Sequence, residues 1–355
     1  MKALYFGTYD RSSPRNTQVV SCLRRAGVTV VERHREVWGR HNWSLGLGQL
    51  ARMARAESAL ARRRDDDADV VVVGYPGHFD MPAARRTARG RPVVFNPLVS
   101  LHDTLVGDRG RFRPRSPAAG ILRTVDNGAF RGADLVVADT EAHAAFFRRA
   151  FGLAEERVAV ALVGADEPLF RPGYHPPEPF HVLFVGKLIP LHGLETILAA
   201  AAQVPDVRFR VVGDGQLAGL LERRPANVEH VPWIPYEELP DAYRAAGCAL
   251  GIFGTGDKGS RVIPNKVFQA LACARPVVTA DTPAVRELLT DGADAILVPP
   301  GDPQALAGAV RRLAADDALA EQVARAGRET FEAHASEDVL GARWRSLLER
   351  AAASR

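Results

Sequence analysis

Lysine is scarce in this sequence, although positive charge is not. The only lysines are Lys2, Lys187, Lys258 and Lys266, whereas lysine and arginine together number 46. Arginine does not replace the compact ammonium group of lysine at every site, and lysine binds phosphate as a point charge. We therefore interpret the three lysines beyond residue 180 as phosphate-binding, with solvated surface residues as the alternative.

Cysteine is equally scarce, and no apolar run approaches the length of a membrane-spanning helix. Cys22, Cys248 and Cys273 lie far apart without the spacing of a metal site, so we expect reduced core residues. The chain opens on a strand pattern and not on a signal-peptide pattern. These absences predict a cytoplasmic protein.

Positive charge is concentrated in the first half of the chain. Residues 1–170 carry 26 Lys and Arg against 19 Asp and Glu, and the remaining residues carry 20 against 23. This excess suggests an anionic partner, such as a lipid phosphate, a membrane surface or an acidic acceptor. A GC-rich genome that inflates arginine is the alternative. No nucleic-acid motif accompanies the charge, so we expect no nucleic-acid partner.

An amphipathic pattern from residue 43 to residue 64 predicts a long helix with a basic face. Such a helix allows peripheral contact with the inner face of a membrane. A helix that packs one face on the core and leaves the other in water is the alternative.

The length of 355 residues predicts two domains. Residues 3–32 read as strand, loop (7–16), helix (17–26) and strand, a Rossmann-like unit. Asp10 and Arg11 follow the first strand, where ligands bind in such folds, and we assign them to the acceptor; a solvated turn is the alternative. Prolines at 172, 176, 177 and 179 predict a linker, which gives domains at 1–170 and 181–335, joined by residues 171–180.

The stretch from Ile252 to Ala280 contains a glycine-rich loop, a short helix and a strand. Its loop places Lys258 and Arg261 among three glycines, and Pro264 suits the first position of the helix, just before Lys266. Free backbone N–H groups and the helix dipole make such a helix start an anion site. The stretch therefore predicts a site for a phosphate or a diphosphate.

The same stretch resembles the donor-binding segment of glycosyltransferase family 4, retaining enzymes of the GT-B fold. Gln269 precedes Ala-Leu-Ala-Cys-Ala-Arg-Pro-Val-Val, where the family has Glu before Ala-Met-Ala-x-Gly-x-Pro-Val-Val. Arg261 stands where the family has an earlier Glu, so both carboxylates are missing. Pro264-Asn265-Lys266 is similar to a variant branch with Pro-Asn-Lys. The resemblance implies that Gln269 holds the nucleotide ribose and that Arg261 suits an anionic sugar or the diphosphate.

A second match opens the C-terminal domain. Gly186-Lys187 and His192-Gly193 resemble the family pattern Gly-Arg-x5-Lys-Gly, whose two cations bind the diphosphate. Lys187 takes the Arg position, and His192 falls at or next to the Lys; a core histidine is the alternative. The further donor contacts that we expect are Gly213, Asp214, Trp233 and Glu287, where Trp233 stacks on the base or simply packs.

A third element follows a strand of the first domain. His102-Asp103 resembles the Thr-Val-His-Asp element of the family, in which the His contacts the donor sugar. The alternative is a helix cap in which Asp103 holds a turn. We assign Asp103 and Arg109 to the acceptor, with a mobile arginine-rich loop as the alternative for the latter.

The resemblance implies an α/β protein of the GT-B fold: two Rossmann-like domains face a central cleft, and a final helix (336–355) crosses back to the first. It implies sugar transfer from a nucleotide-diphosphate sugar with retention of configuration. We expect no cofactor. We also expect no metal, since side chains and helix dipoles take the place of a metal ion in this fold. We expect a UDP-linked donor, with GDP and dTDP as alternatives. The proposed catalytic residues are Lys187, Lys266, His102 and Arg261.

Two other functions stay open at this point. A sugar-nucleotide epimerase of the same fold binds the donor without needing an acceptor. A catalytically silent partner subunit is suggested by the two missing carboxylates. The acceptor itself is open among lipid-linked saccharides, polysaccharides and natural products.

Overall fold

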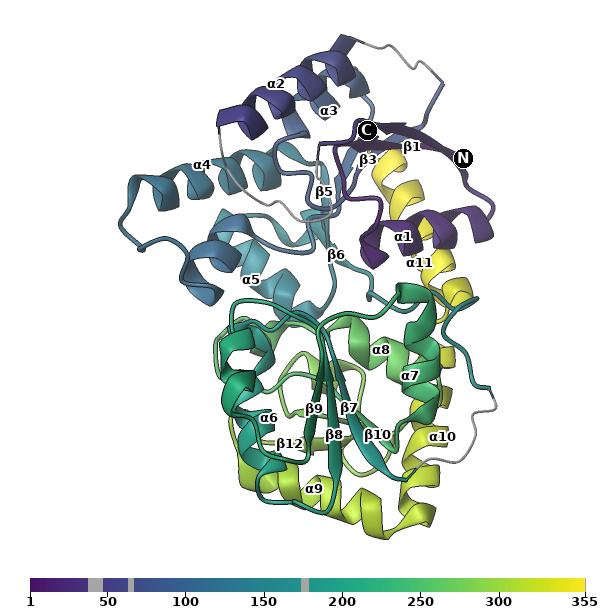
Figure 1. Ribbon diagram of the computed structural model, residues 1–355. Coiled ribbons are helices and arrows are strands. Elements are labelled where there is room, and N and C mark those ends of the chain that lie inside the picture. Colours follow the sequence, from purple (N-terminus) through teal and green to yellow (C-terminus); the bar gives the residue numbers. More distant parts are fainter. Residues whose placement is uncertain (38–46, 63–66, 174–178, 355) are drawn as a thin grey trace. The chain divides into compact units, whose positions relative to one another are not determined.

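The computed structural model describes residues 1–37, 47–62, 67–173 and 179–354, which form two compact units (Figure 1). The first unit consists of residues 1–162 and 337–355, and the second of residues 163–336. The sequence predicts a first domain that ends at residue 170. Phe170 belongs to the second unit, where its ring lies 5.5 Å from that of Tyr236 and 6.0 Å from that of Tyr243. The predicted linker and the predicted helix from residue 43 lie partly outside the described residues.

The first unit is built on six parallel strands in the order β2-β1-β3-β4-β5-β6. The strands are β1 (Lys2–Gly7), β2 (Thr29–His34), β3 (Val70–Val73), β4 (Val93–Phe95), β5 (Leu135–Ala138) and β6 (Val158–Val160). The helices between them are α1 (Pro14–Arg25), α2 (Leu47–Arg62), α3 (Met81–Ala88), α4 (Pro117–Gly132) and α5 (Glu141–Phe151). Strand β3 is four buried valines, as expected where helices cover both faces of a parallel sheet.

Alternate side chains of β1 enter two different apolar cores. Leu4 and Phe6 pack in one cluster with Phe95 and Phe130, whereas Ala3 and Tyr5 pack in another. Successive strand residues point to opposite faces of a sheet. The first sheet is therefore buried on both faces, which is the doubly wound arrangement.

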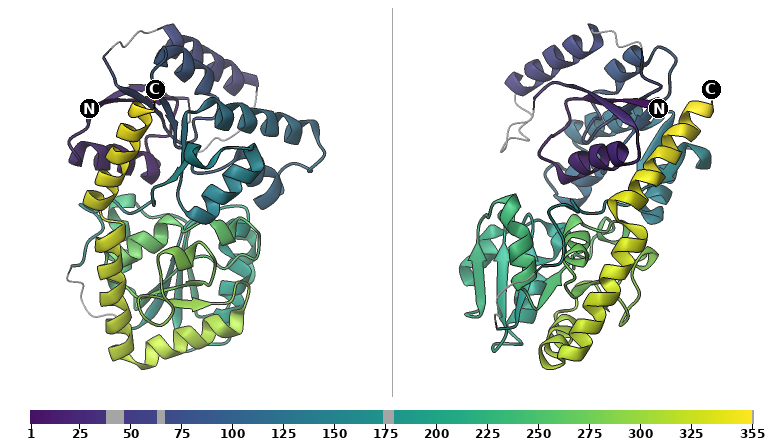
Figure 2. Two further views of the ribbon diagram at one scale, coloured as in Figure 1. Left: turned by 180° about the vertical axis from the view of Figure 1, so that it is seen from behind. Right: turned by 90° about the vertical axis from the view of Figure 1, so that its right-hand side faces the viewer.

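The last helix, α11 (Glu337–Ala353), belongs to the first unit and packs against α1 (Figure 2). A Cβ on Gly341 would lie 2.6 Å from the carbonyl oxygen of Cys22, so only glycine permits this approach. Trp344 is fully buried in the same interface. The predicted return of the final helix to the first domain is confirmed.

The second unit repeats the architecture with the strand order β12-β11-β10-β7-β8-β9, all parallel. Its strands are β7 (His181–Val185), β8 (Arg208–Val212), β9 (Val228–Val231), β10 (Cys248–Leu250), β11 (Val277–Ala280) and β12 (Ile296–Val298). Its helices are α6 (Leu194–Ala201), α7 (Leu239–Ala245), α8 (Asn265–Ala272), α9 (Pro303–Ala315) and α10 (Asp317–His334). The predicted fold class is confirmed for both units. No helix within the described ranges is long and apolar enough to cross a lipid bilayer.

Ala274 is strained, because it adopts a left-handed backbone conformation (φ 51°) just after α8. It stands where the family pattern has glycine, the residue that adopts this conformation without steric cost. We expect Ala274→Gly to raise the free energy of unfolding by about 0.5–1 kcal/mol in urea titrations. Ala315→Gly, at the end of α9, is the matched control and should lower it, since glycine weakens a helix. A loss of stability in Ala274→Gly would contradict the strain.

Candidate active site

Glycine loops follow β7, β8 and β10, and their backbones approach one another closely. A Cβ on Gly213 would lie 2.0 Å from the carbonyl oxygen of Gly186, and one on Gly254 would lie 2.5 Å from that of Leu191. Gly186 and Gly213 have φ angles of 146° and 140°, which favour glycine. We call Gly186, Gly193, Gly213 and Gly254 the glycine shelf. It lies at the carboxyl edge of the second sheet, where doubly wound folds bind ligands.

Lys266, in the first turn of α8, places its ammonium group beside this shelf. Its Nζ lies 3.8 Å from the ring centroid of Phe184 and 2.8 Å from the position that a Cβ on Gly186 would occupy. The residue is 6% exposed, and Nζ has no hydrogen-bond partner. Burial lowers the pKa of Lys266 well below its ordinary value. A buried cation without a counter-charge is costly, so this position suits an anionic ligand.

His192 stands next to the same glycine. It ends the 3-10 helix Pro190–His192, and its Nδ1 bonds to the carbonyl oxygen of Lys187. Its Cε1 lies 3.3 Å from the position of a Cβ on Gly186, and its ring lies 5.7 Å from that of Phe184. The structure therefore brings four of the predicted donor residues together: Gly186, His192, Gly213 and Lys266.

The start of α8 leaves backbone donors available. The helix begins at Asn265, one residue later than the sequence suggested, and Pro264 occupies the N-cap position without a side-chain cap. Proline has no side-chain acceptor for the first N–H groups of the helix, so no cap side chain competes with a ligand for them. The N–H of Val267 bonds to the carbonyl oxygen of Pro264 at 3.0 Å. Both residues are half-buried.

The other predicted donor residues surround this centre with different degrees of exposure. Lys258 is buried just before the 3-10 helix Gly259–Arg261, while Lys187 and Glu287 are exposed. Asp214 is engaged locally, since its Oδ1 accepts a hydrogen bond of 2.7 Å from the N–H of Gly215. Trp233 follows β9 and is 73% exposed, which leaves its ring available for stacking.

Gln269 has a partner that the sequence did not indicate. The hydroxyl of Tyr243, on α7, donates a hydrogen bond of 3.1 Å to its Oε1, and the side chain is 6% exposed. The contact ties α8 to α7. The side chain of Gln269 also hydrogen-bonds to the hydroxyl of Tyr236. The predicted ribose contact stays a prediction.

The predicted residues of the first unit lie in loops at the carboxyl edge of its sheet. His102 precedes a π-helix (Asp103–Asp108), a wide turn that is frequent at functional sites. Its backbone N–H donates to the buried carboxylate of Asp126 at 2.9 Å, and its buried Nε2 has no hydrogen-bond partner. The N–H of Asp103 donates a hydrogen bond of 3.0 Å to the hydroxyl of Ser100. The N–H of Arg109 donates to the carbonyl oxygen of Thr104 and closes the wide turn.

Asp10 and Arg11 form a turn in this structure. The Oδ1 of Asp10 accepts hydrogen bonds from the N–H of Ser12 at 2.9 Å and from its hydroxyl at 2.6 Å. Arg11 forms an ion pair of 3.4 Å with Glu32. This geometry supports the turn interpretation, and a contact of Asp10 or Arg11 with the acceptor stays a prediction.

Sequence reasoning missed a buried pair of acids near β1. Asp80 accepts two hydrogen bonds of 2.8 Å from Thr8, one from its N–H and one from its hydroxyl, and is fully buried. The carboxyl oxygens of Glu57, on α2, are buried, and Asp80 is their neighbour. Burial, and then the carboxylate of Asp80, raise the pKa of Glu57. The glycine at position 7 is the one sign of this pair in the sequence, because a side chain there would collide with Asp80: a Cβ on Gly7 would lie 2.2 Å from Asp80 Oδ2.

This pair predicts a stability that falls as the pH rises. A carboxyl whose pKa is raised by folding is stabilising while protonated, below its unfolded value, and this contribution is lost as the pH rises toward the folded value. We expect Glu57→Gln to reduce the fall in the free energy of unfolding between pH 5 and 9. At pH 8 the variant should have a free energy of unfolding higher by about 1–2 kcal/mol. Thermal unfolding across this range measures it. The exposed Glu156→Gln should leave the profile unchanged, and an unchanged profile in Glu57→Gln would contradict the assignment.

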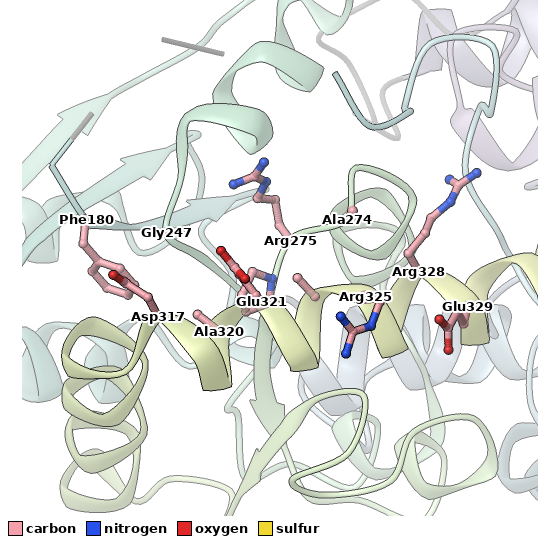
Figure 3. Close-up of a pocket in the computed structure, with 12 residues that line it drawn as sticks. Phe180, Gly247, Ala274, Arg275, Asp317, Ala320, Glu321, Arg325, Arg328 and Glu329 are labelled. Atoms are coloured by element: carbon pink, nitrogen blue, oxygen red, sulfur yellow. The ribbon is translucent and has the colours of Figure 1, made fainter. Parts of the chain in front are cut away.

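A pocket of about 610 Å³ lies elsewhere in the second unit, along α10 (Figure 3). Phe180, Gly247 and Pro276 line it, each of which directly precedes a strand. The pocket therefore opens at the amino edge of the sheet, opposite to the edge that binds ligands in such folds. None of the predicted site residues lines it.

Two family matches identify what the two units are. Residues 7–164 match the family described as Glycosyl transferase 4-like domain, and residues 179–316 match Glycosyl transferases group 1. Together they cover most of the chain. The chain is a glycosyltransferase built from these two domains. The second match includes the glycine shelf and Lys266 of this glycosyltransferase.

Individual relatives agree with this assignment. D-inositol 3-phosphate glycosyltransferase 1 of Catenulispora acidiphila is 26% identical over 308 residues, which cover 76% of this chain and 70% of the relative. Phosphatidyl-myo-inositol mannosyltransferase of Mycobacterium leprae is 32% identical over 154 residues, which cover 42% of this chain and 41% of the relative.

Solved structures share the fold. Sucrose-phosphate synthase from Thermosynechococcus elongatus superposes with a TM-score of 0.77 at 19% identity and covers 100% of this chain and 99% of its own. Anabaena HepE in complex with UDP-glucose superposes with a TM-score of 0.72 at 18% identity, and the match covers 99% of this chain and 100% of HepE. These likenesses extend over the whole glycosyltransferase and give it the GT-B fold.

Proposed function

We propose that this glycosyltransferase moves a sugar from a UDP-linked donor to an acceptor with retention of configuration and without a metal or cofactor. The observation that carries the donor site is the buried Nζ of Lys266, which lies beside the glycine shelf without a hydrogen-bond partner. A UDP complex of a protein with the same fold supports the choice of base. The GDP- and dTDP-linked donors are the alternatives.

The chemistry that follows is stabilisation of the leaving diphosphate. As the glycosidic bond to the donor breaks, negative charge builds on the phosphate oxygens. Lys266 and backbone N–H groups at the start of α8 would meet that charge without rearranging, because they are already held in place. Lys187, Lys258 and Arg261 add charge from the neighbouring loops, while His102 would contact the donor sugar from the first unit.

The acceptor is proposed to be anionic and to meet the first unit. Exposed Arg111, Arg113 and Arg115 precede α4, on which Ile121 is 63% exposed. Basic side chains beside an exposed apolar one suit a lipid surface. The two relatives described above are named for inositol phosphate and phosphatidylinositol acceptors, which supports the same choice. We accordingly propose a cytoplasmic enzyme with peripheral membrane contact.

Product analysis tests the proposed reaction. The protein is incubated with UDP-sugars and candidate acceptors, and the products are read by NMR. Free UDP with a new glycoside of the donor's anomeric configuration supports it, whereas an isomerised UDP-sugar identifies an epimerase. Calorimetry with UDP, GDP and dTDP comes first, because a chain that binds none of them acts as a silent partner subunit.

A further inference from the structure

Lys266 is the buried lysine of the proposed donor site, and no acid among the described residues forms an ion pair with it. Its Nζ faces the ring of Phe184 at 3.8 Å and has no hydrogen-bond partner, and the residue is 6% exposed. The adjacent segments carry the bases His192, Lys258 and Arg261 and the acids Asp214 and Asp257. Burial lowers the pKa of Lys266, and no charged group, acid or base, contributes beside it. An apolar surrounding favours the neutral amine.

A diphosphate changes this balance. It brings at least two negative charges to the glycine shelf, and an opposite charge within hydrogen-bonding distance favours the charged form of lysine. We propose that Lys266 is a neutral amine in the free protein and takes up one proton from solvent when the diphosphate of the donor binds. The inference rests on the proposed donor site, and it means that binding of the donor is accompanied by uptake of one proton. The amine nitrogen gains the proton, and no other bond forms or breaks.

Such coupling gives the affinity a distinctive pH dependence. Uptake of one proton weakens UDP binding by up to about tenfold for each unit of pH rise, between the pKa of the free amine and that of the bound ammonium. The terminal phosphate of UDP ionises near pH 6, so its own titration is complete above about pH 7.5. A fall in affinity above that pH therefore reports the amine.

The scarcity of lysine makes a direct test possible. Protein labelled with ¹³C at the lysine ε position should show four signals, one for each lysine, and single Lys→Arg variants assign them. We expect the Lys266 signal to titrate at a lower pH than the other three in the free protein. Saturating UDP should move it to the charged form at pH 8. A Lys266 signal that titrates with the others, or that stays neutral with UDP bound, overturns the inference.

Calorimetry supplies the second measurement and separates the two proposals. UDP is titrated at pH 8 in HEPES and in Tris, whose ionisation enthalpies differ, so the difference in heat counts the protons taken up. We expect about one proton for the natural protein and about none for Lys266→Met. Lys187→Met is the matched control and should weaken binding while keeping the uptake. Binding without uptake in the natural protein overturns this inference alone, whereas the absence of UDP binding overturns the proposed function.

Discussion

Replacing Lys266 with methionine should lower kcat/KM for sugar transfer by about 30- to 1000-fold, equivalent to about 2–4 kcal/mol of transition-state stabilisation. Methionine fills a similar volume in the pocket over Phe184 but carries no charge to meet the leaving diphosphate. Steady-state kinetics with a UDP-sugar donor measure the effect. The loss should appear in kcat as well as in KM, because charge on the diphosphate increases as the bond breaks.

The same variant should not lose stability. Keeping a lysine buried without a partner costs free energy, which methionine removes, so the free energy of unfolding should stay constant or rise. Lys187→Met is the comparison, and its loss of activity should be smaller because Lys187 is exposed and water screens its charge. Wild-type rates in Lys266→Met would exclude the phosphate role.

Gly213→Ala should be the most destabilising single change to the glycine shelf. Its φ of 140° is unfavourable for alanine, and the added methyl would lie 2.0 Å from the carbonyl oxygen of Gly186. Because this contact is backbone on backbone, no side chain can turn aside to relieve it. We expect a loss of about 3 kcal/mol or more of unfolding free energy, measured by urea denaturation.

Nucleotide binding should fall in the same variant, since the shelf must open to admit the methyl group. Gly219→Ala, six residues further along, is the matched control: nothing lies within 4 Å of the position of its Cβ. It should leave both stability and UDP affinity close to those of the natural protein. A stable Gly213→Ala protein with full affinity would show that the shelf is not as tight as the structure describes.

The sequence was informative where side-chain pattern and backbone geometry agree. The stretch from Ile252 to Ala280 predicted a short helix followed by a strand, and α8 and β11 confirm both. The prediction was wrong at the start of α1, since the sequence pattern indicates a loop up to Asn16. The helix begins at Pro14, and Arg15 is fully buried, with its guanidinium bonded to the carbonyls of Ala161 and Leu162. A charged residue carries no local sign that distant carbonyls will surround it.

In the candidate site, too, local features could be predicted from the sequence and distant contacts could not. The glycines and lysines could be identified along the chain, because each conformational or charge requirement is local to its residue. The pairing of Gln269 with Tyr243 and of Glu57 with Asp80 could not. In each pair the partners lie more than twenty residues apart on different elements, so their contact depends on tertiary packing alone.

The packing of α11 against α1 has a consequence for biosynthesis. The chain completes the first unit only with residues 337–355, after all of residues 163–336 have been made. While the ribosome makes the second unit, Val19, Cys22 and Leu23 of α1 lack the helix that finally shares their core. Nascent chains that stall within the second unit would therefore expose this apolar surface, which makes α1 the expected contact for a chaperone during translation.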